Sequence, residues 1–249
     1  MIKEIDDDAV VLRTYKSGES DRIAVLWTRK HGKVRVLAKG IRKSTSRLGG
    51  NLEPLAYVHV DLVKSRGELY ITRHVQHREH YPVMRSSYER INAGYAVVEV
   101  IDAIPSDDVA DEGIFELLIR VLGSIDDEHF VPGLIPASFF FKLLSHDGSE
   151  PVVDNCVNCG SAGPLVAFNA QVGGTLCANC RSGHAISHDA LVLIRRILGG
   201  DLASVLREQS APGAGEVMTI AHDAIEQHFG KRLKVTRASA PITLLSSDQ

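Results

Sequence analysis

The sequence predicts a multidomain α+β protein in which a small β-barrel is followed by a helical domain that carries a four-cysteine insert. Five strand-like segments fall within the first 80 residues, apolar residues recur at helical spacing after Pro82, and every cysteine lies between Cys156 and Cys180. The predicted boundaries are 1–80 for the barrel, 81–150 with 183–240 for the helical domain, 151–182 for the insert and 241–249 for a flexible tail.

The barrel prediction rests on β-branched residues and on alternation with a period of two. Lys33 and Arg35 alternate with Val34 and Val36, which places the basic side chains on one face and the valines on the core face. The predicted strands cover 9–15, 22–28, 33–38, 55–63 and 69–76. Five strands in so short a stretch favour an OB-fold, a barrel that binds single strands on one face and in its loops. An SH3-like barrel is the alternative.

Apolar periodicity predicts helices in the rest of the chain. They cover 86–104, 111–125, 136–146, 187–198, 201–209 and 215–229. Ser86 or Ser87 and Ser187 have the side chains expected of N-caps. The run Phe139-Phe140-Phe141 is expected to pack in the helical core, with an exposed groove for a partner as the alternative.

The four cysteines form two C-x2-C pairs, Cys156 with Cys159 and Cys177 with Cys180, separated by seventeen residues. Four thiolates at this spacing can close a tetrahedral shell around one zinc ion, and Gly160 favours a tight turn after the first pair. Because the protein supplies all four ligands, the ion is expected to be structural and to leave no position for a substrate. Two disulfides or a redox pair are the alternatives.

The charge is unevenly distributed along the chain. The net charge is −3, yet the stretch from Arg13 to Arg47 holds eleven Lys and Arg residues against Glu19 and Asp21, a local charge of +9. This asymmetry indicates a polyanionic partner, and a solvated basic face is the alternative. Strand positions Lys33 and Arg35 together with the following basic loop could contact phosphates without reading bases.

Aromatic residues accompany the basic stretch. For Tyr15, Trp27, Tyr57 and Tyr70, burial in the barrel is expected, with stacking on bases as the alternative.

Composition is ordinary for a soluble protein, at 44% hydrophobic and 24% charged residues. The acidic start lacks the features of a signal peptide and no apolar run suits a membrane span, so a cytoplasmic protein with reduced thiols is expected.

Motifs for catalysis are absent from the sequence. It has no G-x4-G-K-[ST] phosphate loop, no H-E-x-x-H and no G-x-S-x-G, so we expect neither an enzyme nor a small-molecule substrate.

Two clusters of polar residues need an interpretation. The histidines His74, His77 and His80 are interpreted as a polar junction, with a metal site or a pH switch as the alternative. The three consecutive aspartates at positions 6–8 are interpreted as part of a solvated terminus, with a Mg²⁺ site as the alternative.

Several short motifs resemble a known family when they are taken together. They are Gly18-Glu19-Ser20-Asp21-Arg22, His31-Gly32-Lys33-Val34-Arg35, Ala38-Lys39-Gly40, Ser46-Arg47-Leu48-Gly49-Gly50, Leu52-Glu53-Pro54 and Gly67-Glu68-Leu69. With the order of barrel, helical block, cysteine insert and helical tail, they resemble the bacterial recombination mediator family RecO over nearly the whole chain. The resemblance implies an N-terminal OB-fold, a helical domain and, as in many members, a zinc module.

The resemblance also implies a role in recombinational DNA repair. RecO-like proteins bind single- and double-stranded DNA, anneal complementary strands and help to load RecA onto strands coated by the single-strand-binding protein SSB. The implied partners are DNA, RecR, the C-terminal tail of SSB on the helical domain and, indirectly, RecF, in the bacterial cytoplasm and at the nucleoid during repair. A zinc-containing RNA-binding or scaffold protein without annealing activity is the alternative.

The resemblance implies seven contacts with the DNA backbone, all of them basic residues of the barrel and its loop. They are Arg22, Lys33, Arg35, Lys39, Arg42, Lys43 and Arg47. In the helical domain, Lys142, Arg195 and Arg196 are candidate contacts for the acidic SSB tail.

Overall fold

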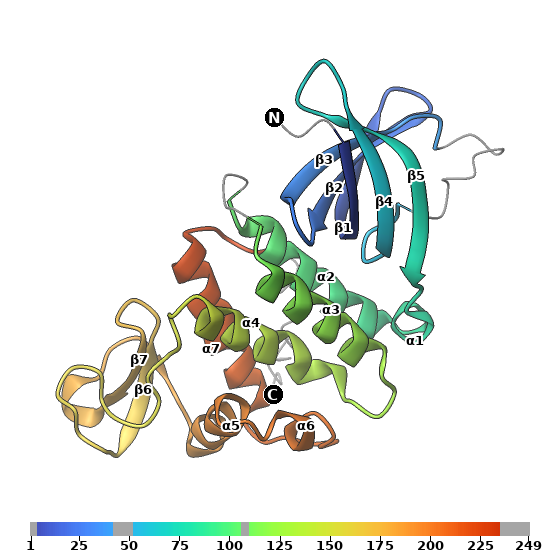
Figure 1. Cartoon of the computed structure of the whole chain (residues 1–249). Coiled ribbons are helices and arrows are strands. Elements are labelled where there is room, and N and C mark those ends of the chain that lie inside the picture. Colours follow the sequence, from blue (N-terminus) through green and yellow to red (C-terminus); the bar gives the residue numbers. More distant parts are fainter. Residues whose placement is uncertain (1–3, 42–51, 106–109, 235–249) are drawn as a thin grey trace, which may run out of the picture. The chain divides into compact units, whose positions relative to one another are not determined.

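The computed structural model describes residues 4–41, 52–105 and 110–234 (Figure 1). They fall into two compact units, Met1–Glu128 and His129–Gln249. The first unit contains a β-barrel and three helices, and the second contains the remaining helices together with a small sheet that carries the cysteines. The predicted tail 241–249 lies outside the described residues.

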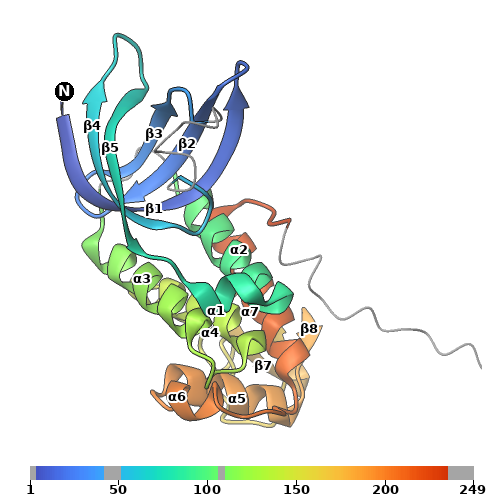
Figure 2. The ribbon, with the colours of Figure 1, turned by 90° about the vertical axis from the view of Figure 1, so that its right-hand side faces the viewer.

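Five strands form the barrel: β1 (Glu4–Ser17), β2 (Asp21–Thr28), β3 (Gly32–Ala38), β4 (Tyr57–Lys64) and β5 (Tyr70–Glu79). They pair in the order β1-β2-β3-β5-β4, and β4 pairs with β1 to close the barrel (Figure 2). β3 runs parallel to β5, whereas the other neighbours are antiparallel. The predicted OB-fold is confirmed, and the SH3-like alternative is not adopted.

Apolar side chains from all five strands fill the barrel. Ile5, Leu26, Val36, Val60 and Val75 belong to one buried cluster, one residue from each strand. Since side chains alternate between the two faces of a strand, this core leaves the intervening residues of each strand on the outside. The predicted division of β3, with its valines in the core, is therefore confirmed.

The N-terminal aspartates match the prediction of a solvated terminus only in part, since the side chain of Asp6 is 78% exposed. They lie within β1, and Asp7 is buried, with only 4% of its surface exposed. Its carboxylate accepts a hydrogen bond from the backbone N–H of Lys30 at 2.8 Å and lies 2.9 Å from Nδ1 of His31. The prediction is wrong here because a carboxylate can be buried in a strand when a turn supplies donors for it.

Three helices complete the first unit: α1 (Pro82–Ser86), α2 (Tyr88–Ala103) and α3 (Glu112–Asp126). The helix predicted over 86–104 is confirmed by α2, whereas the short helix α1 was not predicted. Ser87 adopts an extended backbone, and its hydroxyl caps α2 by accepting a hydrogen bond from the N–H of Arg90. Asp111 caps α3 in the same way through the N–H of Ile114.

The second unit has a helical part with α4 (Ile135–His146), α5 (His188–Leu198), α6 (Leu202–Val205) and α7 (Ala214–Phe229), preceded by a short 3-10 turn at Pro132–Leu134. Helix α7 packs against α4 and α5. Phe139, Phe140 and Phe141 are all buried, which confirms that this run packs in the core. Ser187 caps α5 as predicted, and α6 is shorter than the predicted helix 201–209. No helix in the described ranges is long and apolar enough to cross a membrane.

Candidate metal site and nucleic-acid interface

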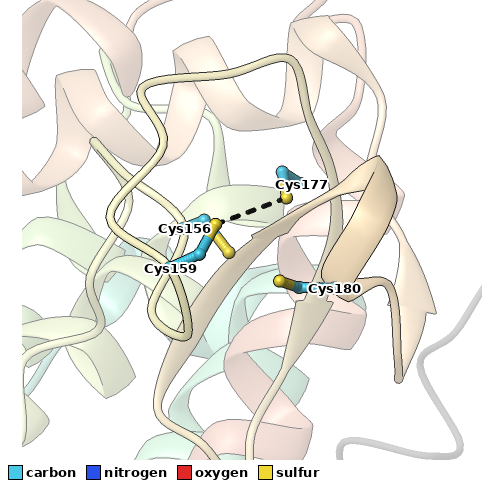
Figure 3. A group of neighbouring side chains, drawn as sticks. All are labelled: Cys156, Cys159, Cys177 and Cys180. Atoms are coloured by element: carbon cyan, nitrogen blue, oxygen red, sulfur yellow. Dashed lines mark hydrogen bonds between the residues drawn. The ribbon is translucent and has the colours of Figure 1, made fainter.

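The four cysteines come from two chain segments that fold against each other. Cys156 and Cys159 lie on a tight turn, in which the N–H of Gly160 donates to the carbonyl of Cys156 at 2.8 Å. Gly160 has a φ of +73°, a left-handed conformation that glycine adopts without strain. Cys177 ends strand β7 (Gly174–Cys177), and Cys180 ends the 3-10 turn Ala178–Cys180. Figure 3 shows the four sulfur atoms gathered between the two segments.

The spacing of the sulfur atoms fits a tetrahedral metal shell. All four lie within 4.8 Å of one another, and the sulfur atoms of Cys159 and Cys177 are 3.7 Å apart. Zinc–sulfur bonds of about 2.3 Å in a tetrahedron place the sulfur atoms about 3.8 Å apart. None of the four cysteines forms a disulfide. The structure thus brings together all four predicted ligands, and they could hold one metal ion.

The thiols differ in acidity because of their surroundings. Backbone N–H groups, foremost that of Cys177, lower the pKa of Cys156 to about 6. Hydrogen bonds with neighbouring sulfur atoms, foremost that of Cys159, raise the pKa of Cys180 to about 12. Several thiolates at this distance repel one another, and a divalent cation between them would remove that repulsion. The electrostatics of the cluster therefore favour a cation at its centre.

The apolar cluster that directly surrounds the cysteines is small. Strands β6 (Leu165–Asn169), β7 and β8 (His184–Ala185) form a sheet in the order β7-β6-β8. Its buried cluster consists of Cys156, Ala167, Leu176 and Cys177, and two of these four residues are ligands. So small a core supplies little stability, and in modules of this kind metal binding contributes much of the folding free energy.

Close backbone contacts also shape the module. A Cβ atom on Gly174 would lie 2.4 Å from the carbonyl oxygen of Val152, and one on Gly183 would lie 2.4 Å from that of Phe168. Gly183 also has a φ of +79°. These two positions therefore require glycine if the sheet is to keep its geometry.

A second group of potential ligands lies on α7, and the sequence analysis did not identify it. His222, Asp223 and Glu226 bring one ligand atom each to within 4.8 Å of the others. Protein groups already contact the two carboxylates. His184 Nε2 lies 2.8 Å from Asp223, and the N–H of Leu233 donates to Glu226 at 2.6 Å. The spacing of His222 and Glu226, four residues apart on a helix, is the signal that could have revealed the group.

The predicted DNA contacts that the structure describes do not all lie on an open surface. Arg35 in β3 and Lys39 just after it are exposed, and Arg22 in β2 is partly exposed. Arg22 pairs with Ala38, so it lies beside the end of β3 that leads to Lys39. The remaining predicted contacts, Arg42, Lys43 and Arg47, lie outside the described residues.

Lys33 requires a correction to the sequence-based interpretation. Only 7% of its side chain is exposed, and its ammonium donates hydrogen bonds to the carbonyl oxygens of Asp102, at 2.8 Å, and of Ile104. It also lies 3.7 Å from the Asp102 carboxylate. A cation at the C-terminal end of a helix stabilises the helix dipole and its unpaired carbonyls. Lys33 thus joins β3 to the end of α2, and we leave it out of the proposed DNA interface.

The aromatic residues of the barrel have different surroundings. Trp27 is buried, with 1% of its surface exposed, as expected. Tyr15, Tyr57 and Tyr70 are only partly covered. Tyr57 contacts the ring of Phe115 edge-on, whereas the hydroxyl of Tyr15 contacts an exposed arginine, Arg35.

The candidate contacts for an acidic tail are partly occupied by this chain's own groups. Arg195 donates to the carbonyl oxygen of Val153, at 2.7 Å from Nη2, and Arg196 pairs with Asp201 and Glu208. Lys142 is partly exposed. The histidines at 74, 77 and 80 are not part of any group of three potential metal ligands within the described ranges.

The comparisons with known proteins agree over both halves of the chain. Residues 1–81 match the family Recombination protein O N terminal, and residues 85–237 match Recombination protein O C terminal. The chain is 32% identical to DNA repair protein RecO of Nocardioides sp., over 92% of this chain and 96% of the relative. It is 36% identical to the DNA repair protein RecO of Cutibacterium acnes, over 78% of this chain and 82% of the relative. It is 33% identical to the DNA repair protein RecO of Streptomyces griseus, over 80% of this chain and 84% of the relative. The chain belongs to the recombination protein O family.

Proposed function

We propose that this protein is a DNA repair mediator that binds single- and double-stranded DNA through the outer surface of its barrel. In this proposal it anneals complementary strands and helps to load RecA onto strands coated by SSB. It acts with RecR and the SSB tail, and indirectly with RecF, in the cytoplasm and at the nucleoid. The observation that carries the proposal is membership of the recombination protein O family along nearly the whole chain.

The charges of the barrel supply a physical mechanism. Two DNA strands repel each other, and cations that contact both backbones lower this repulsion while counterions are released. Arg35 and Lys39 are exposed near the end of β3, next to the segment that carries Arg42, Lys43 and Arg47. Base pairing is favourable once the strands meet, so the reaction needs no nucleotide hydrolysis and no catalytic residue. Such contacts address phosphates and therefore bind DNA without sequence specificity.

In this proposal the cysteine module holds one structural Zn²⁺ through Cys156, Cys159, Cys177 and Cys180. The distances between sulfur atoms support zinc, because a four-thiolate shell is typical of structural zinc sites. When bound, zinc would neutralise the thiolates and stabilise the sheet. A closed shell leaves no coordination position for water or substrate, so the ion would have no part in DNA chemistry.

The test is annealing of two complementary strands that are first coated with SSB and are followed by fluorescence. The protein should accelerate annealing, and the double variant Arg35→Ala/Lys39→Ala should lose most of that acceleration. Arg66→Ala is the matched control, since it removes an exposed arginine from the turn between β4 and β5. No acceleration by the wild-type protein would contradict the mediator function, and tighter binding of RNA than of DNA would favour an RNA-binding protein.

Affinity as a function of salt gives a second measure. Contact with about five phosphates predicts that log affinity for a single strand falls with log salt at a slope near −3.5. Removing two contacts in Arg35→Ala/Lys39→Ala should reduce the magnitude of the slope by about 1.4. Binding that does not depend on salt would contradict an interface made of phosphate contacts.

A further inference from the structure

The outer surface of β1, β2 and β3 carries two rows of side chains that cross the three strands. In the first row, Arg13 pairs with Val25, and Val25 pairs with Arg35. In the second row, Tyr15 pairs with Ile23, and Ile23 pairs with Leu37. Side chains of directly paired residues lie on the same face of a sheet, so each row is continuous across the strands.

The two rows differ in how far they are covered. Val25 is buried, with 1% of its surface exposed. By contrast, Tyr15, Ile23 and Leu37 are each partly exposed. The second row thus presents an aromatic ring and two aliphatic side chains, side by side, on the surface of the barrel.

Two arginines contact the tyrosine side chain, Arg35 at the hydroxyl and Arg13 over the ring. Nη2 and Nε of Arg35 donate hydrogen bonds to the Tyr15 hydroxyl oxygen, at 2.6 and 3.2 Å. The guanidinium carbon of Arg13 lies 5.9 Å from the centre of the ring, while its Nε lies 2.7 Å from the Asp102 carboxylate. These contacts restrict the ring to one orientation and so lower the entropic cost of binding a ligand on it.

The charge next to the ring is available to an anion. Arg35 is exposed, and in the described part of the chain it has no carboxylate partner. A guanidinium has five N–H donors, and the Tyr15 hydroxyl engages only two of its nitrogen atoms. Arg35 can therefore contact a phosphate and keep its contact with the ring.

We propose that Tyr15, together with Ile23 and Leu37, forms a stacking site for one unpaired nucleobase, and that Arg35 contacts a neighbouring phosphate. The proposal rests on the DNA binding proposed above and adds that the barrel distinguishes single strands by their exposed bases. A flat aromatic surface beside a cation is the arrangement by which proteins bind single-stranded nucleic acid without reading its sequence. A base in a duplex is already stacked on both sides, so the site selects single strands.

The experiment compares two single strands of equal length and charge, one of thymidines and one with abasic sites throughout. The wild-type protein should bind the thymidine strand about tenfold more tightly, since stacking of a base on an aromatic side chain strengthens binding by about this factor or more. Tyr15→Leu should remove this preference and bind the abasic strand like the wild type. Tyr15→Phe keeps the ring and should keep most of the preference.

The outcomes separate this inference from the proposed function. If the wild-type protein binds both strands equally, or if Tyr15→Leu keeps the preference, the stacking site is refuted while DNA binding stands. If neither strand is bound, the proposed function itself fails. Equal binding of the two strands by the wild-type protein refutes the site without any variant, so the proposal can fail even if Tyr15→Leu does not fold.

Discussion

Replacing Lys33 by methionine tests the assignment of this residue to the fold. Methionine keeps an unbranched apolar stem of similar size but removes the ammonium, which donates to the carbonyl oxygens of Asp102 and Ile104. The Lys33 side chain is 7% exposed, so water cannot readily replace these bonds. Hydrogen bonds from a charged donor contribute about 1.5–3 kcal/mol each, and the two bonds share one ammonium. We therefore expect Lys33→Met to lower the free energy of unfolding by about 2–4 kcal/mol.

Lys39→Met is the matched control, because Lys39 is exposed and lies just after the same strand. We expect it to change the free energy of unfolding by less than about 0.5 kcal/mol, as is usual for surface substitutions. If Lys39 contacts one phosphate, its removal should reduce the salt slope for single-stranded DNA by about 0.7. Lys33→Met should leave that slope unchanged.

Two assays are needed. Unfolding in urea is monitored by fluorescence, and DNA binding is measured at several salt concentrations under conditions in which the variant is folded. The reasoning would be refuted if Lys33→Met were as stable as the wild type and reduced the salt slope as Lys39→Met does. That result would mean that the Lys33 side chain leaves the end of α2 and reaches the DNA.

Three further predictions concern the metal, the sheet around it and acid pH. Elemental analysis should find one zinc ion per chain. Cys180→Ser or a strong chelator should remove this ion and lower the midpoint temperature of thermal unfolding. Retention of the metal by the variant would contradict the four-cysteine shell. Gly183→Ala should weaken zinc affinity in a chelator competition, because its Cβ would lie 2.4 Å from a carbonyl oxygen, and unchanged affinity would show that the sheet can adjust. The pKa of Asp8 is lowered, because burial, which raises it, is outweighed by hydrogen bonds with His59 and Arg78. A lowered pKa stabilises the fold above the ordinary value of about 3.9 and loses that effect as the pH falls through the folded value. Urea midpoints of Asp8→Asn should therefore depend less on pH between about 5 and 2 than those of the wild type, and parallel pH profiles would contradict this.

The features that the sequence predicted correctly depend on short stretches of chain. The C-x2-C pairs identified all four potential ligands, because a tight turn brings the two sulfur atoms of each pair together locally. Ser187 was predicted as an N-cap from its position before an apolar helix, since a cap contacts only the next turn of its own helix. Alternation in β3 likewise indicated which side chains face the barrel core, because the period of a strand is a property of its backbone.

The tertiary structure alone decided what covers the outer faces of the strands. Lys33 and Arg35 have the same pattern in the sequence and lie on the same face of β3, yet one is buried and the other exposed. The difference arises because the end of α2, about seventy residues later in the chain, supplies carbonyl oxygens to Lys33 and none to Arg35. Asp7 is buried for a similar reason, since its hydrogen-bond donors come from Lys30 and His31, in the turn between β2 and β3. Alternation specifies the face on which a side chain lies, but contacts between distant segments determine whether that face meets protein or solvent.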